Sequence, residues 1–150
     1  MESLFHPTGN QHILERIDKL TPIKLSEWGV MTVSQMLEHC KMPLQVVYGT
    51  KQIKVNPLVK LLFGRSAKKQ FTSAHPFGKG MPTAKEFKVN FEPDFETTKR
   101  ELKELIIQFS REGQGGIKVT DHPLFGKMTY EEIDVAQWKH LDHHLKQFGV

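Results

Sequence analysis

Residues 129–150 have the sequence TYEEIDVAQWKHLDHHLKQFGV, which predicts a long amphipathic helix. Thr129 is followed three residues later by Glu132, the spacing at which two side chains cap each other's free backbone N–H groups at a helix start. The apolar residues that follow recur at helical spacing and include Ile133, Leu141, Leu145 and Phe148. The segment is therefore expected to bury one face against other helices.

Three further helices are predicted upstream, over residues 8–21, 32–48 and 95–112. The first two begin with the same kind of cap, Thr8 with Gln11 and Thr32 with Gln35. Asp94 precedes the third, which ends at a glycine-rich run. Four amphipathic helices in a chain of 150 residues predict a single all-α domain over residues 1–150.

The second and third of these four helices are separated by more than forty residues, which is longer than the usual connection in a helix bundle. The expected architecture is therefore an all-α four-helix bundle with one long crossover between helices two and three. Within the crossover, Asn56 and Pro57 are expected to begin a short helix that ends at Gly64. Prolines and glycines beyond Gly64 predict extended or turning chain.

The composition, with 38% hydrophobic and 25% charged residues, is typical of a folded water-soluble protein. No apolar run approaches the roughly 20 residues needed to cross a bilayer, and the first residues lack a signal-peptide pattern. Cys40 is the only cysteine, so no intramolecular disulfide can form, and its place on the apolar stripe of helix two predicts an inert core thiol. We therefore expect a cytoplasmic protein without a membrane partner.

The net charge of +4 is concentrated in one part of the chain. Residues 50–90 hold nine Lys or Arg and one acid, whereas the rest of the chain holds 12 basic and 16 acidic residues. This basic segment coincides with the crossover and lacks a nucleic-acid recognition helix or a series of stacking aromatic residues. A small anionic molecule is therefore favoured over nucleic acid as its partner, with Lys68 and Lys69 as the residues expected to attract it.

Three histidines lie within five residues of the last predicted helix. His140 and His144 are four residues apart, so they lie roughly 40° apart around the helix, where two imidazoles can reach one cation. Helical projection places both at the border of the buried stripe and places His143 on the polar side. A third ligand is expected from another helix, and His39 lies at the edge of the apolar stripe of helix two.

We interpret the remaining histidines as turn or solvated residues: His6, His12, His75 and His122. We also interpret His143 as a solvated residue. Pairs of His at this spacing also arise by chance, and a buried His is usually hydrogen-bonded without binding metal. Spacing alone leaves two roles open for His39, His140 and His144. They could bind a metal, or they could have a purely structural role.

Three stretches of the sequence resemble the DinB-like proteins: WGVMTVSQMLEHC at 28–40, HPLFGKMTYEE at 122–132 and KHLDHHLKQFGV at 139–150. The resemblance covers nearly the whole chain and is most specific to a subfamily of uncharacterised domains. It implies a four-helix bundle of up-down-down-up type that holds a divalent metal, zinc or nickel, through one His on helix two and an HxxxH pair on helix four. The matching positions are His39, His140 and His144.

Relatives of that family include S-transferases that act with low-molecular-weight thiols. The resemblance therefore implies that the three-His metal site activates a small thiol for transfer to a small-molecule substrate, although no catalytic residue follows from it. The alternative is a non-enzymatic bundle, with a homodimer as one arrangement, whose histidines are structural and whose basic crossover binds an anionic partner.

Overall fold

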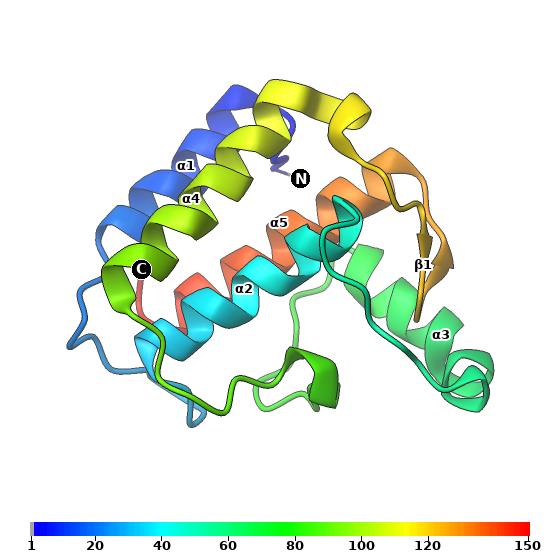
Figure 1. The fold of residues 1–150 in the computed structure, drawn as a ribbon, viewed down its shortest axis with the longest axis horizontal. Coiled ribbons are helices and arrows are strands. Elements are labelled where there is room, and N and C mark those ends of the chain that lie inside the picture. Colours follow the sequence, from blue (N-terminus) through cyan, green and yellow to red (C-terminus); the bar gives the residue numbers. More distant parts are fainter. Residues whose placement is uncertain (1) are drawn as a thin grey trace.

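The computed structural model describes residues 2–150 and is mostly helical (Figure 1). Within these residues the α-helices are α1 (Pro7–Asp18), α2 (Val33–Val47), α3 (Pro57–Thr72), α4 (Phe95–Glu112) and α5 (Tyr130–Gln147). The other elements are two short 3₁₀ helices, η1 (Lys85–Phe87) and η2 (Gly113–Gly116), and the antiparallel strands β1 (Asp121–His122) and β2 (Gly126–Lys127). None of the helices described over this range has the length and apolar character needed to cross a membrane.

Four of the helices pack in a closed ring, in which α1 contacts α4, α4 contacts α2, α2 contacts α5, and α5 contacts α1. Helices α2 and α4 run in one direction, whereas α1 and α5 run in the opposite direction (Figure 1). Because two parallel helices cannot be joined by a short turn, the chain must return along the length of the ring between α2 and α4. This geometry explains the long crossover.

Most of the predicted helix starts are confirmed. Reciprocal capping boxes form at two of them, Thr32 with Gln35 and Thr129 with Glu132. Asp94 caps α4 by accepting a hydrogen bond from the backbone N–H of Thr97 at 2.9 Å. The cap expected at Thr8 is wrong, because α1 already begins at Pro7 and no side chain caps it. Proline at the first helical position has no N–H to be capped, and its backbone angle already suits a helix.

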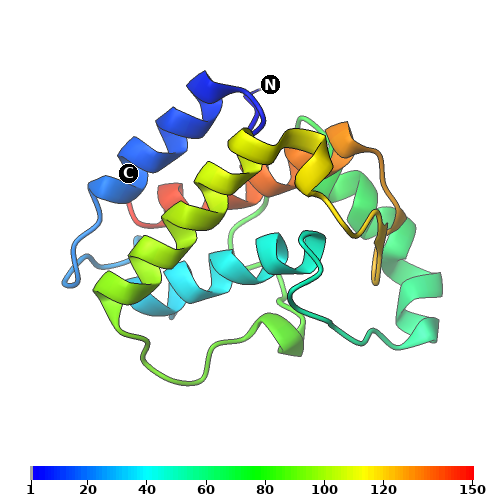
Figure 2. The ribbon, with the colours of Figure 1, turned by 45° about the horizontal axis from the view of Figure 1, so that its top comes forward.

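The helix predicted to end at Gly64 is longer than expected and continues to Thr72 as α3. A Cβ atom at Gly64 would lie 2.6 Å from the backbone oxygen of Leu124, so the missing side chain lets α3 approach the segment between β1 and β2 closely. Helix α3 packs against α5 and lies outside the ring of four (Figure 2). Gly64 is therefore a packing residue, and the helix does not end there.

The hydrophobic core fills the inside of the ring. Its largest fully buried side chains include Phe109, Phe148, Ile13, Leu37 and Ile133. A polar tie fixes α1 against α5, because Arg16 donates to the Asp142 carboxylate at 2.8 Å and to the backbone oxygen of Val150 at 2.9 Å. This tie holds the C-terminal part of α5, which carries His140, His143 and His144.

Candidate metal centre

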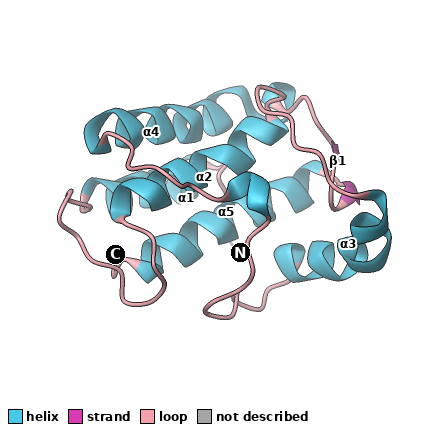
Figure 3. Cartoon of the chain, turned by 60° about the horizontal axis from the view of Figure 1, so that its bottom comes forward, coloured by secondary structure: helices cyan, strands magenta, loops and turns pink. Residues whose placement is uncertain are grey.

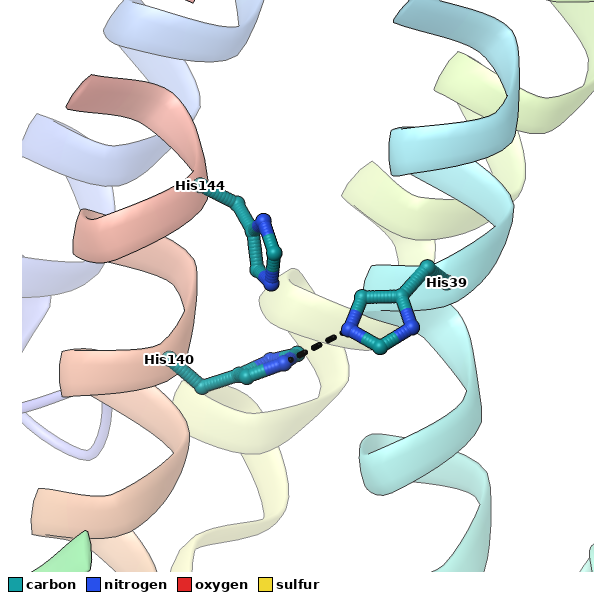
Figure 4. A group of neighbouring side chains, drawn as sticks. All are labelled: His39, His140 and His144. Carbon is teal, nitrogen blue, oxygen red and sulfur yellow. Dashed lines mark hydrogen bonds between the residues drawn. The ribbon is translucent and has the colours of Figure 1, made fainter. Parts of the chain in front are cut away.

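The facing surfaces of α2 and α5 bring His39, His140 and His144 together (Figure 4). All three side chains are buried, and one ring nitrogen from each lies within 4.8 Å of the other two. His39 comes from the middle of α2, whereas His140 and His144 project from successive turns of α5. The structure thus brings together the three residues that helical spacing and the resemblance both select.

A backbone carbonyl from the crossover orients the imidazole of His39. The Nδ1 atom of His39 lies 2.8 Å from the backbone oxygen of Phe87, in the short helix η1. Because a carbonyl oxygen can only accept a hydrogen bond, Nδ1 carries the proton and Nε2 presents a lone pair. The crossover therefore fixes which nitrogen of His39 faces the cluster.

A glutamine on the same helix orients the imidazole of His144. Its Nδ1 atom lies 2.8 Å from Oε1 of Gln147, and the amide nitrogen of Gln147 donates to the backbone oxygen of Trp28 at 2.7 Å. Since that amide nitrogen is committed to Trp28, the amide oxygen must face His144 and accept the Nδ1 proton. The Nε2 atom of His144 is left with a lone pair, and Figure 4 shows this ring pointing toward the other two.

The third imidazole, His140, completes the cluster from within the core. Its Nε2 atom lies 3.0 Å from Nε2 of His39, and its buried Nδ1 atom has no hydrogen-bond partner in the described part of the chain. Since Nε2 of His39 carries no proton, His140 must supply the one between them. A cation could replace that proton, because tetrahedral zinc at Zn–N distances of about 2.0–2.1 Å spaces its nitrogen ligands about 3.3 Å apart.

Burial keeps the three imidazoles neutral. It lowers the pKa of His39, and it lowers the pKa of His140 strongly, with a further contribution from the neighbouring His144 and His39. The pKa of His144 falls to about 3, chiefly through burial. Neutral imidazole is the form that binds metals, so these donors are available throughout the neutral pH range.

Three neutral nitrogen donors form a ligand set typical of catalytic zinc sites, which keep a fourth position for water or substrate. Among residues 2–150, the cluster contains no carboxylate or thiolate that would offset the charge of a bound cation. A divalent ion held here would therefore keep its full double charge. Such a site can act as a Lewis acid or lower the pKa of a bound water or thiol.

His143 is half-buried, which corrects the expectation that it lies on a solvated face. Its ring centroid lies 5.9 Å from that of Trp28, 5.5 Å from that of Phe77 and 5.1 Å from that of His144. The Nζ atom of Lys79 lies 4.3 Å from the centroid of Trp28. Segments before α2 and after α3 therefore fold over this side of α5. We call Trp28, Phe77 and His143 the aromatic cover.

The two lysines predicted to attract an anionic ligand lie on α3. Lys68 forms an ion pair with Glu132 at 2.8 Å and donates to the backbone oxygen of Lys127 at 2.7 Å. Lys69 is exposed. Their role in ligand binding stays a prediction, and Lys79 is a further cation, which contacts the aromatic cover at Trp28.

The interpretation of His122 as a solvated turn residue is wrong with respect to solvation. Its side chain is buried, and its Nδ1 atom accepts hydrogen bonds from the backbone N–H groups of Leu124 and Phe125 at 3.1 and 3.2 Å. These bonds close the turn between β1 and β2. Burial and the nearby charge of Lys60 lower the pKa of His122 to about 4. The other three outlying histidines, His6, His12 and His75, are exposed as expected.

Cys40 is a buried core thiol, as expected from its place on the apolar stripe. Its Sγ atom lies 3.7 Å from the sulfur of Met36, and burial raises the pKa of the thiol well above its usual range. A thiol that stays protonated is a poor nucleophile and a poor metal ligand. Cys40, although it follows His39 in the sequence, therefore contributes no ligand to the histidine cluster.

Three residues that orient the cluster were not predicted from the sequence. Gln147 follows His144 by three residues on one helix, so its spacing is a signal that the sequence does contain. Phe87 acts through its backbone carbonyl, which every residue possesses, so nothing in the sequence marks it. Trp28 likewise acts through its backbone oxygen on Gln147.

Neither the curated proteins nor the solved structures contain a match to the chain. Residues 2–149 match the family described as Protein of unknown function (DUF1569). This match spans all five helices, including the two that carry the histidine cluster. The resemblance to DinB-like proteins stays a prediction. The extent of the family match leads to one conclusion, that this chain belongs to the DUF1569 family.

Proposed function

We propose that the chain binds a divalent metal ion, zinc or nickel, through the Nε2 atoms of His39, His140 and His144. The observation that carries this proposal is the way two of these rings are oriented. Separate acceptors, the Phe87 carbonyl and the Gln147 amide oxygen, take the Nδ1 protons of His39 and His144. Partners of this kind are typical of metal-ligating histidines, because they fix the tautomer and raise ligand basicity.

A purely structural role accounts less well for the cluster. Buried polar groups in proteins are normally hydrogen-bonded, and leaving one unpaired costs about 1–3 kcal/mol. The Nε2 atoms of His39 and His144 both carry lone pairs, and His140 can supply only one Nε2 proton between them. A metal bound through the three Nε2 atoms would give each of these lone pairs a partner, while Nδ1 of His140 would still have none in the described part of the chain.

We further propose that the site serves a thiol-dependent transfer reaction on a small-molecule substrate. A metal bound here would lower the pKa of a thiol and favour its thiolate form. In the reaction the thiol proton goes to solvent, and the sulfur forms a bond to an electrophilic carbon as the leaving group departs with its electron pair. Within the chain, the aromatic cover offers apolar contact and Lys79 offers positive charge to an anionic group of the thiol.

Elemental analysis of the purified protein tests the metal site. We expect the wild type to contain zinc or nickel at close to one ion per chain, and the His39→Ala, His140→Ala and His144→Ala variants to lose it. His143→Ala is the matched control, because it removes the neighbouring imidazole of α5 and should keep the metal. Retention of full metal content by His140→Ala, or failure of the wild type to bind added zinc, would contradict the proposal.

The transferase proposal requires a separate measurement. The metal-loaded protein is incubated with a low-molecular-weight thiol and an aromatic electrophile, and the loss of free thiol is followed. We expect turnover that His144→Ala abolishes and that a chelator removes. A protein that binds metal but gives no thiol consumption above the uncatalysed rate would overturn the transferase role and leave the metal site standing.

A further inference from the structure

The first two turns of α3 expose a group of large apolar side chains. They are Leu58, Val59, Leu61, Leu62 and Phe63, with exposed fractions from 42% for Val59 to 77% for Leu61. We call these five residues the apolar end of α3. A contiguous group of this size on the surface is unusual for an isolated soluble domain and marks a contact with another molecule or surface.

The rest of the helix explains why this end stays uncovered. Beyond its midpoint, α3 is fastened to α5 and to the strand pair. Gly64 lies against the backbone of Leu124, Phe71 packs on Phe125 with ring centroids 4.9 Å apart, and Lys139 donates to the backbone oxygen of Ser73 at 3.1 Å. The apolar end precedes these contacts, and Figure 3 shows α3 at the periphery of the molecule, beside β1. The apolar end therefore lies at the outside of the molecule with its side chains exposed.

The same segment is strongly basic. Residues 51–72 contain six Lys or Arg and no Asp or Glu. Two of the six are neutralised by other parts of the chain, because Lys60 lies 3.7 Å from the Asp121 carboxylate and Lys68 pairs with Glu132. Three others are exposed and form no ion pair within residues 2–150: Lys54, Arg65 and Lys69.

Apolar and cationic residues share one exposed stripe of α3. Leu58, Leu62, Arg65 and Lys69 are spaced four, three and four residues apart, which places them on one side of the helix. The N-terminal half of this stripe is apolar and the C-terminal half is cationic. A surface that combines exposed Leu and Phe with Lys and Arg fits the boundary between lipid headgroups and acyl chains in an anionic membrane.

We propose that α3 docks the protein onto an anionic lipid bilayer, with the apolar end inserted among the acyl chains and the cations on the headgroup phosphates. This proposal departs from the expectation, drawn from the sequence, of a protein without a membrane partner. Two other occupants fit the observations less well. A second copy of the chain, paired symmetrically through this face, would bring two unneutralised cationic segments together. Nucleic acid would engage the cations, but it would leave five apolar side chains without a matching apolar surface.

Co-sedimentation with lipid vesicles tests the proposal. We expect the full-length protein to bind vesicles of equal parts phosphatidylglycerol and phosphatidylcholine at low salt and to bind pure phosphatidylcholine at least tenfold more weakly. Each neutralised cation near the surface is worth about 1 kcal/mol, or about fivefold in partitioning. The Arg65→Ala and Lys69→Ala variants should each show a loss of that size, and added salt should weaken binding further.

The apolar contribution is tested with a double variant, Leu58→Ser with Leu62→Ser. We expect it to lose binding to the anionic vesicles by tenfold or more while its circular dichroism spectrum stays unchanged. Ile23→Ser with Leu25→Ser is the matched control, since these residues are 85% and 84% exposed but lie outside the basic segment. The control should bind like the wild type.

Any one of several results would overturn the proposal. They are equal binding to anionic and uncharged vesicles, unchanged binding by the Leu58/Leu62 variant, and absence of vesicle binding in protein that instead forms a dimer disrupted by that variant. Tight binding of single-stranded DNA with no vesicle binding would also reject it in favour of a nucleic-acid surface.

Discussion

Oε1 of Gln147 accepts the Nδ1 proton of His144 across 2.8 Å, one helical turn further along α5. The amide is held in this orientation because its nitrogen donates to the backbone oxygen of Trp28. A loop residue therefore decides, through Gln147, which nitrogen of His144 faces the other two histidines. The orientation of the candidate ligand depends on a chain of two hydrogen bonds that begins outside the helix.

Replacing Gln147 with Leu should weaken metal binding without removing a ligand. The substitution keeps a similar volume but removes the acceptor, so the His144 ring loses both its fixed tautomer and its orientation. Loss of such a partner typically lowers metal affinity about 10–100-fold. Competition against a chromophoric chelator measures this affinity. Gln108→Leu, at a glutamine on α4 whose side chain donates to Glu112, is the control and should bind zinc as tightly as the wild type.

Replacing His122 with Asn should make the stability of the protein less sensitive to acid. The pKa of His122 is about 4 in the folded state against 6.5 for an ordinary histidine, so the unfolded chain takes up a proton in this range and the folded chain does not. Stability is therefore lost as the pH falls from about 6.5 to 4, by about 3 kcal/mol from this residue. Asn can accept the same two backbone hydrogen bonds but does not titrate.

Urea unfolding of the metal-free proteins at pH 7 and pH 4.5 measures the difference. The His122→Asn variant should lose less stability between the two pH values than the wild type. His75→Asn, at an exposed position, should lose as much as the wild type does. Equal losses for the wild type and His122→Asn would show that His122 contributes nothing to the acid response.

Replacing Gly64 with Ala should loosen the attachment of α3. In a free helix the change would stabilise by about 1 kcal/mol, but the new methyl group would lie 2.6 Å from the Leu124 oxygen. Forcing an extra methyl into a packed contact costs about 1–3 kcal/mol, so the net effect is expected to be destabilising. Limited proteolysis of residues 64–73 should become faster. Gly78→Ala, where a Cβ meets nothing within 4 Å, should leave the cleavage rate unchanged.

Replacing Thr129 with Ala should destabilise the protein by about 1 kcal/mol, because it removes the side chain that caps α5. Thr8→Ala makes the same chemical change inside the first turn of α1, where Thr8 caps nothing. Its effect on the free energy of unfolding should be a few tenths of a kcal/mol at most. Thermal or urea unfolding compares the two variants directly, and equal losses would show that the Thr129 cap adds no stability.

Much of the helical framework could be predicted from local patterns. Thr32, Asp94 and Thr129 identify the starts of α2, α4 and α5 because capping depends on residues only two or three positions away. The length of α3 could not be predicted in the same way. Glycine has a low helix propensity, so Gly64 predicts the end of a helix. In the structure it instead allows close packing against Leu124, which only the folded chain brings next to it.

The candidate ligands themselves were predictable because an HxxxH spacing on a helix fixes the relative position of His140 and His144. The surroundings of the cluster were not. His143 is half-buried because two loops fold over it, and the placement of such loops is a tertiary property. The hydrogen bond from His39 to the Phe87 carbonyl has no sequence signature, since a backbone oxygen is present at every position.

The two helices that supply the cluster are far apart in the order of synthesis. His39 and His140 are separated by 101 residues, and α5 follows every other described helix. At roughly 5–20 residues per second, a ribosome needs roughly 5–20 s to pass from one to the other. During that interval α2 presents one imidazole without its partners. A site with all three ligands can therefore form only after α5 has been synthesised and has docked against α2, so full metal affinity would report the docking of these two helices.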